Sequence, residues 1–183
     1  MLTVAPPKPL AGPYDAPLRA AKVTPELQHA IEQFLYRQAE CLDTRRWQDY
    51  IDRFAADGIY WMPAQPEQTT GDGEPSIFYE DRDLMTIRLK RLGHPHAWSQ
   101  QTEWGLSHVV GNVIIERHDP AAGIVECRSR FQMMEFRRDV VRQFAGSYLH
   151  HLRQVGDGWK IVLQRVDMVN GAGPYEYVLQ AWV

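Results

Sequence analysis

The last third of the chain most constrains its fold, because it reads as one continuous series of long strands. Between Ser107 and Val169 the sequence holds four strand-like runs, SHVVGNVIIER, IVECRSRFQMMEF, VVRQFAGSYLHHLR and WKIVLQRVDMVN. The turn signals between them are HDPAAG, RRD and VGDG. Short connections of this kind favour hairpins, so the sequence predicts four consecutive antiparallel strands. Helical patterns precede them, which indicates an α+β fold in which a curved, cone-like antiparallel sheet is wrapped on N-terminal helices.

The N-terminal half carries those helical patterns. Thr24 suits an N-cap and Pro25 suits the first helical position. Apolar residues then recur with helical spacing, first at Leu27, Ile31, Phe34, Leu35 and Leu42, and again at Trp47, Tyr50, Ile51 and Phe54. After them we expect a short strand at GIYWMPA, a polar loop at PAQPEQTTGDGEP and a third helix at DRDLMTIRLKRL.

Strand alternation predicts which side chains share a face of the sheet. In the second long run Val125, Cys127, Phe131 and Met133 point one way and the charged residues between them point the other. In the first long run the same alternation puts Val109, Val113 and Ile115 on one face, and His108, Val110, Asn112, Ile114 and Glu116 on the opposite face.

A chain of 183 residues suits one domain with a full-sized core, and we expect that domain over residues 24–183. Residues 1–23 hold five prolines and show no apolar periodicity. Because proline stiffens the chain and removes backbone donors, we predict an extended N-terminal segment there. It is either a loose tail or an arm lying on a neighbouring subunit. It lacks the continuous apolar core of a secretory signal.

Composition excludes several classes of partner. The net charge is −3, which gives no general attraction to nucleic acid or anionic lipid. No apolar run approaches the roughly 20 residues of a membrane helix. The two cysteines lie far apart in sequence, as expected for free thiols in a reducing cytoplasm. We therefore expect a cytoplasmic protein.

Candidate catalytic chemistry is sparse. His94 and His96 could share a metal ion, but they lack further ligands and also fit an ordinary exposed loop. His108 could line a pocket with Tyr36 and Tyr60 and act there in general acid–base catalysis, or it could be a hydrogen-bonded core histidine. The sequence has no nucleophile elbow, phosphate loop or dinucleotide fingerprint.

Other residues point to an interface. Trp98, Trp104 and Trp182 fall in loop-like or terminal positions, where an exposed tryptophan is typical of contacts between subunits. Arg137 and Arg138 belong to a small basic run at a predicted hairpin, which fits either a solvated turn or a salt-bridged interface. We predict these five residues as interface candidates.

The stretch FLYRQAECLDTRRWQDYIDRFAADGIYWMP resembles the opening of the small, or beta, subunit of aromatic-ring-hydroxylating dioxygenases of the Rieske type. The resemblance covers about residues 27–183 and continues through SIFYEDRDLMTIRLKRL, LSHVVGNV and RRDVVRQFAGSYLHHLRQVGDGWKIVLQRVDMVN. Within the family, FAGSYLHHLR and VDMVNG are more similar to members that serve benzoate-type aromatic acids than to those serving bicyclic hydrocarbons.

This resemblance implies the cone fold shared with nuclear-transport-factor-2-like and ketosteroid-isomerase-like proteins. It implies a non-catalytic structural subunit that holds no cofactor and no catalytic residue of its own. The Rieske 2Fe–2S cluster and the mononuclear Fe(II) would sit in a partner alpha subunit, in a trimer of alpha–beta pairs served indirectly by reductase or ferredoxin components. The alternatives are a stand-alone cone-fold isomerase or dehydratase, using His108 with Tyr36 or Tyr60, and a small-ligand-binding protein.

Overall fold

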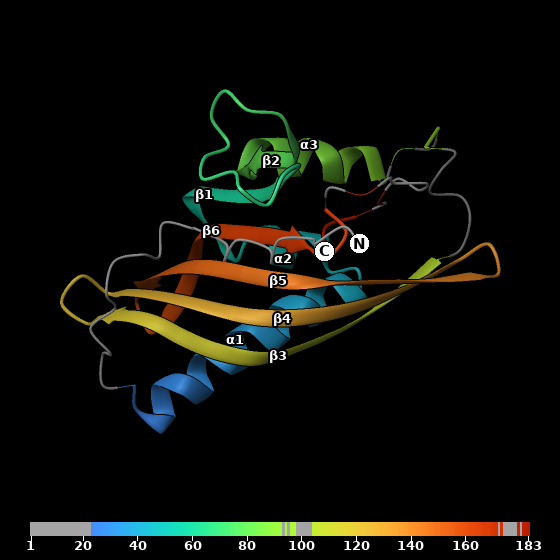
Figure 1. Cartoon of the computed structure of the whole chain (residues 1–183). Coiled ribbons are helices and arrows are strands. Elements are labelled where there is room, and N and C mark those ends of the chain that lie inside the picture. Colours follow the sequence, from blue (N-terminus) through green and yellow to red (C-terminus); the bar gives the residue numbers. More distant parts are fainter. Residues whose placement is uncertain are drawn as a thin grey trace, which may run out of the picture.

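The computed structural model of this chain (Figure 1) describes residues 23–92, 94, 96, 97, 104–171, 173, 179 and 181–183. Residues 1–22 and Trp98 lie outside the described residues. The predicted N-terminal segment and the interface prediction for Trp98 therefore stay predictions.

The helices begin where the sequence predicts. Helix α1 spans Pro25–Asp43, and the Oγ1 atom of its N-cap, Thr24, accepts a hydrogen bond from the Leu27 backbone N–H at 3.2 Å. A short α2, Trp47–Ile51, follows, and α3 covers Arg82–Leu92. None of the helices that the structure describes is long and apolar enough to cross a bilayer.

Six strands form one curved sheet in the order β2-β1-β6-β5-β4-β3. They are β1 (Phe54–Pro63), β2 (Ser76–Asp81), β3 (Trp104–Asp119), β4 (Ile124–Arg137), β5 (Val140–Val155) and β6 (Gly158–Met168). The predicted series of four hairpin-linked strands is confirmed as β3 to β6. The sheet is not wholly antiparallel, because β1 returns to the far side of the meander and pairs in parallel with β6.

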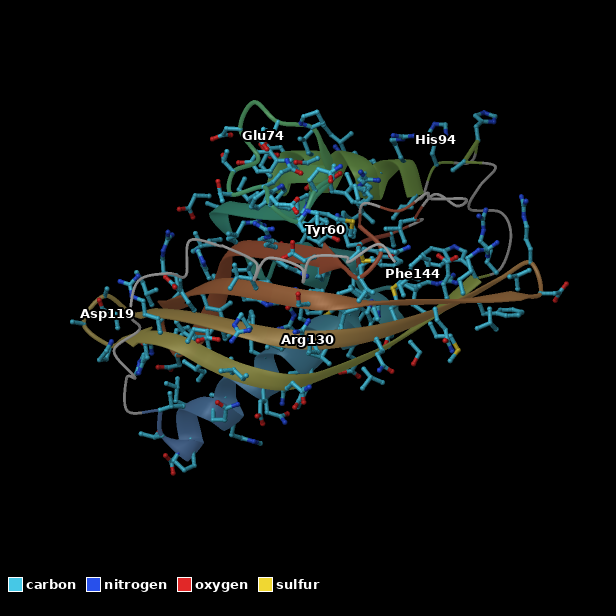
Figure 2. All side chains as sticks on the ribbon, in the orientation of Figure 1. Tyr60, Glu74, His94, Asp119, Arg130 and Phe144 are labelled. Carbon is cyan, nitrogen blue, oxygen red and sulfur yellow. The ribbon has the colours of Figure 1, made fainter. Side chains whose placement is uncertain are left out.

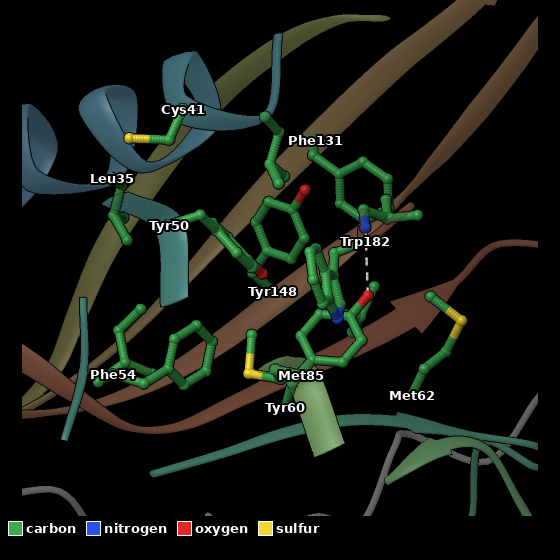
Figure 3. Packing of buried hydrophobic residues seen from close by; sticks show 14 of the residues in the cluster. Leu35, Cys41, Tyr50, Phe54, Tyr60, Met62, Met85, Phe131, Tyr148 and Trp182 are labelled. Carbon is green, nitrogen blue, oxygen red and sulfur yellow. Dashed lines mark hydrogen bonds between the residues drawn. The ribbon is translucent and has the colours of Figure 1, made fainter. Parts of the chain in front are cut away.

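The helices cover one face of the sheet, which we call the inner face. Figure 1 shows α1 lying across this face beside β3 and β4, and the Gln28 side chain donates to the Val113 carbonyl at 3.0 Å. The core forms between the helices and the inner face, and residues near the C-terminus pack into it (Figure 3). The opposite, outer face of β3, β4 and β5 carries side chains such as Arg130 (Figure 2).

Strand β4 alternates as predicted, with Val125, Cys127, Phe131 and Met133 all buried. In β3 the predicted shared face of Val109, Val113 and Ile115 is wrong. The pairing of β3 with β4 shifts register between Gly111 and Ile114. A β-bulge of this kind adds one residue and reverses the alternation beyond it. Val109 is therefore 66% exposed on the outer face, whereas Val113 and Ile115 pack against the core.

The bulge depends on Asn112, whose φ of 52° lies in the left-handed region. Asparagine tolerates this region, whereas a β-branched residue does not. We expect Asn112→Val to lower the free energy of unfolding by about 1–2 kcal/mol. The control Asn112→Gly should stay within about 0.5 kcal/mol of the natural chain, since glycine adopts positive φ freely. Urea unfolding measures both, and equal stability of the two variants would contradict the role of the bulge.

Candidate functional site

The space between the helices and the inner face is where a cone-shaped fold could hold a ligand, and here it is filled. Tyr50, Tyr60, Phe131 and Trp182 meet in this space and are each at most 2% exposed (Figure 3). Among the described residues, the cavity left between α1 and the sheet measures about 10 Å³. Ligand pockets measure roughly 300–1,000 Å³, so this interior has no room for an aromatic substrate.

The polar groups of the interior bond to one another. Gln164 is the centre of the network: its Oε1 accepts from Gln38 Nε2 at 2.5 Å and from the Tyr50 hydroxyl at 2.9 Å. Its Nε2 donates to the Val183 carbonyl at 3.4 Å, and the Val183 N–H donates to the Tyr60 hydroxyl at 3.2 Å. Buried polar groups that satisfy each other in this way hold elements together. The network joins α1, α2, β1 and β6 to the C-terminal segment.

Trp182 extends the network to α3. Its indole Nε1 donates to Glu80 Oε2 at 2.9 Å, and Arg88 Nε donates to Glu80 Oε1 at 2.8 Å. The Trp182 ring also contacts Trp47, with ring centroids 6.2 Å apart, and Trp47 stacks on Trp104 at 5.9 Å.

Trp104 and Trp182 are 5% and 1% exposed within this chain alone. The chain's own core therefore buries both, so neither is exposed as their sequence positions suggested. Their loop-like or terminal positions in the sequence gave no sign of this burial, since the contacts come from elements distant along the chain. That they lie at an interface stays a prediction.

His108 lies on the inner side of β3 and is bonded to Asp43, the last residue of α1. Its Nδ1 is 2.6 Å from Asp43 Oδ1, and its backbone N–H donates to Asp43 Oδ2 at 2.9 Å. The His108 side chain is fully buried and the Asp43 side chain is 25% exposed. The pair ties the end of α1 to the edge strand of the sheet. The sequence alone did not indicate Asp43 as the partner of His108, because 65 positions separate the two residues.

The structure does not bring Tyr36, Tyr60 and His108 together in one pocket. Tyr36 is 39% exposed on α1, whereas Tyr60 is fully buried on β1 and bonded to Val183. None of these three residues lines the interior cavity. Burial also raises the pKa of the Tyr60 hydroxyl far above its usual value, which leaves it a poor proton donor.

The other predicted positions fall at the ends of elements. His94 and His96 lie after α3 with ring centroids 5.5 Å apart, and His94 Nδ1 accepts from the His96 backbone N–H at 3.1 Å. Within the described part of the chain, no three His, Cys, Asp or Glu residues gather as metal ligands would. Arg137 is buried, and Arg138 is exposed in the two-residue turn between β4 and β5.

The outer face of the sheet carries a group of exposed apolar residues. At the end nearest the β4–β5 turn, Val109, Met134, Phe136 and Val141 are 66%, 44%, 45% and 54% exposed. Their strand register puts them on one surface, and Val169, 80% exposed, lies just beyond β6. A groove of about 450 Å³ runs between them, lined by residues that include Ser107, Val109, Gln132, Met134, Gln143 and Val169. We call this the outer groove.

The other end of the same face is charged. Arg117 Nη1 lies 3.0 Å from Glu126 Oε1, and Arg128 pairs with Glu116, so these ion pairs bridge β3 and β4. The outer face is thus divided into a charged half and an apolar half. Large exposed apolar patches mark interaction sites on proteins of this size.

The chain is similar in sequence to a family of known proteins. The family model described as "Ring hydroxylating beta subunit" matches residues 37–172. The beta subunit of chlorobenzene dioxygenase from Cupriavidus sp. (strain PS12) is 34% identical over 74% of this chain and 77% of its own length. The beta subunit of toluate 1,2-dioxygenase from Pseudomonas putida is 27% identical over 77% of this chain and 89% of its own.

Among solved structures, naphthalene 1,2-dioxygenase with indole bound in its active site matches with a TM-score of 0.70 and 15% identity, over 88% of each chain. At that identity the match shows the fold, a helix-backed curved sheet of the cone type. In the part of the chain that the structure describes, this fold leaves a cavity of about 10 Å³ between α1 and the sheet. The chain belongs to the ring-hydroxylating beta subunit family, as its sequence resemblance implied. It is thus a component of a multicomponent ring-hydroxylating dioxygenase.

The bond between His108 and Asp43 should stabilise the fold rather than take part in a chemical step. We expect His108→Ala and Asp43→Ala each to lower the free energy of unfolding by about 1–3 kcal/mol, since each leaves a buried partner unsatisfied. The double variant should cost less than the sum, because the two residues share one interaction. Chemical denaturation of the four proteins measures this coupling. Turnover of the assembled enzyme should stay within about tenfold for His108→Ala, and a loss of about a thousandfold would indicate an active site.

His150 predicts a pH dependence of stability. It is 1% exposed with neither ring nitrogen hydrogen-bonded, and burial, aided by neighbouring His151, lowers its pKa to about 3. An unfolded histidine binds its proton below about pH 6.5, whereas the folded one stays neutral until about pH 3. Above about pH 6.5 His150 is neutral in both states and costs no stability. Below that value only the unfolded chain binds the proton, so the free energy of unfolding decreases as the pH falls.

Between about pH 6 and pH 4, we expect His150 to lower the free energy of unfolding by about 1.4 kcal/mol for each unit that the pH falls. His150→Leu should remove this contribution to the pH dependence of the free energy of unfolding. The carboxylates that titrate in the same pH range are present in both proteins, so their contribution cancels in the comparison. Denaturant titrations at several pH values measure the difference. Parallel pH profiles for the two proteins would show that His150 gains a proton without unfolding.

Proposed function

We propose that this chain is a non-catalytic structural subunit that supports a trimer of alpha subunits in the dihydroxylation of an aromatic substrate. The closed interior carries this proposal, because a cavity of about 10 Å³ excludes an arene from the place where the fold could bind one. An isomerase, a dehydratase or a small-ligand-binding protein with this fold would need that space open. The aromatic substrate, whether an acid or a hydrocarbon, is then bound by the alpha subunit.

The cofactors of the reaction belong, in this proposal, to the alpha subunit: a Rieske 2Fe–2S cluster and a mononuclear Fe(II). A Rieske cluster needs two cysteines and two histidines. The two cysteines of this chain, Cys41 on α1 and Cys127 on β4, are both fully buried, and burial raises the pKa of the Cys127 thiol to about 12. A thiol with that pKa is a poor ligand at neutral pH, so Cys127 does not fit a cluster.

The role we propose is to hold the geometry of the alpha subunits. If electrons pass from the cluster of one alpha subunit to the iron of its neighbour, as the family resemblance implies, the rate depends on how the alpha subunits are arranged. A trimer of alpha–beta pairs, in the cytoplasm and served by reductase or ferredoxin components, would fix that arrangement. The apolar half of the outer face supports this proposal, since it offers surface for contacts between subunits.

Co-expression with the alpha subunit tests the proposal. Without this chain we expect the alpha trimer to dissociate and activity to be lost, and adding the purified chain back should restore both. Size-exclusion chromatography with light scattering follows assembly, and product formation follows activity. The control is iron content per alpha polypeptide, which should be equal in the assembled fractions. A fully active alpha trimer without this chain, or conversion of substrate by this chain alone, would refute the proposal.

Hybrid complexes test whether the chain also shapes the substrate pocket. When this chain is paired with the alpha subunit of a related dioxygenase, we expect the product profile of the alpha donor, with modest shifts only. Chromatographic analysis of the products decides the matter. A profile that follows the beta donor would mean that this chain contributes to the pocket.

A further inference from the structure

The outer groove has a chemistry that limits what can bind in it. None of the described residues that line it carries a charge. Apolar side chains, including Val109 and Val169, form one part of the lining, and the carboxamides of Gln132, Gln143 and Asn170 form the other. A charged ligand would lose its hydration there without gaining a counter-charge. A neutral, extended peptide would place apolar side chains on the valines and backbone carbonyls near the carboxamide N–H donors.

Proline-rich segments match such a groove well. A proline has no N–H that needs a partner, its ring packs on apolar side chains, and its carbonyl accepts hydrogen bonds. Proline-rich chains are also extended before they bind, so that docking costs less conformational entropy than for other peptides. A groove of about 450 Å³ accommodates a few residues of such a chain.

The protein carries a segment with this chemistry at its own N-terminus. Residues 1–22 contain five prolines, and Lys8 is the single charged side chain among the first fourteen residues. This segment also precedes residue 37, where the match to the family model begins. Its composition is therefore a property of this chain and not of the shared core.

The segment is long enough to reach the groove. Gln28 donates to the Val113 carbonyl at 3.0 Å, which fixes the start of α1 against β3. Val109 lies four positions earlier on that strand, about 13 Å away. Twenty-two residues in a polyproline II conformation span about 70 Å. Because β3 is the last strand of the sheet, the described structure has no neighbouring strand to block the path around it.

We propose that residues 1–22 dock in the outer groove of the same molecule and cover its apolar residues. Phe136 and Val141, which do not line the groove, stay exposed on the outer face. A tether of this kind supplies an effective concentration on the order of 1 mM. A dissociation constant of about 0.1 mM for the free segment would then keep the groove occupied about nine-tenths of the time.

A cysteine placed in the groove reports its occupancy. The two natural cysteines are fully buried, so Val109→Cys adds one accessible thiol to the full chain. We expect this thiol to react with a maleimide about tenfold more slowly in the full chain than in a variant lacking residues 1–22. A synthetic peptide of residues 1–22 at about 1 mM should restore the protection to the shortened chain. The same peptide with Pro6, Pro7 and Pro9 replaced by alanine should protect less.

Ile87→Cys is the matched control, since Ile87 is 53% exposed on α3, away from the groove. Its labelling rate should not change with the segment or the peptide, and thermal unfolding of each variant confirms that it folds. Equal labelling of Val109→Cys with and without residues 1–22 would overturn the proposal. Protection that persists without the segment and grows with protein concentration would also overturn it, and would identify a second copy of this chain as the occupant. The measurement needs no alpha subunit, so its outcome is separate from that of the proposed function.

Discussion

The hydrogen bonds that Gln164 and Glu80 make inside the cone are the constraint on which the rest of the structure depends. Gln164 bonds to α1 and α2, and Glu80 bonds to α3 through Arg88. Both also bond to the C-terminal segment, through Val183 and Trp182. A buried polar group left without its partner costs about 1–3 kcal/mol. These elements therefore stabilise one another, and among the described residues the cavity between α1 and the sheet is about 10 Å³.

Because the described interior is filled, the surface is where this chain can bind other molecules. The same layout of helices on a curved sheet leaves space for a ligand only if the side chains between the layers are small or few. Here Tyr50, Tyr60, Phe131 and Trp182 occupy that space. Several of the apolar side chains that remain exposed lie on the opposite side of the sheet, where they are open to other chains. The division between the two faces supports the proposal of a subunit that assembles rather than reacts.

Local patterns in the sequence were sufficient for most of the fold. The turn signals predicted the hairpins from β3 to β6, and Thr24 with Pro25 predicted the start of α1, because these features depend on near neighbours. The resemblance correctly gave the family and the fold. The bulge at Asn112 could not be read from alternation, since asparagine occurs in regular strands, turns and left-handed positions alike. Because the bulge was missed, the sequence prediction put Val109 on the same face as Val113 and Ile115, whereas it lies on the outer face.

The candidate sites were harder to predict because they depend on distant residues. His108 has a partner 65 positions away, and Trp182 reaches Glu80 across 102 positions. No spacing rule connects such pairs. Trp104 and Trp182 fall in loop-like or terminal positions of the sequence, although the tertiary structure buries both.

The parallel pairing of β1 with β6 has a consequence for how the chain folds. Phe54 pairs with Ile161 and Ile59 with Leu163, so that nearly the whole domain lies between the two strands. Topologies with such long-range pairings fold slowly, because the entropy of closing a large loop is lost before the contacts form. Before β6 has been synthesised and has paired with β1, that edge of β1 is unpaired and can pair with strands of other chains. Early binding of a partner would then protect the chain against aggregation, besides building the complex.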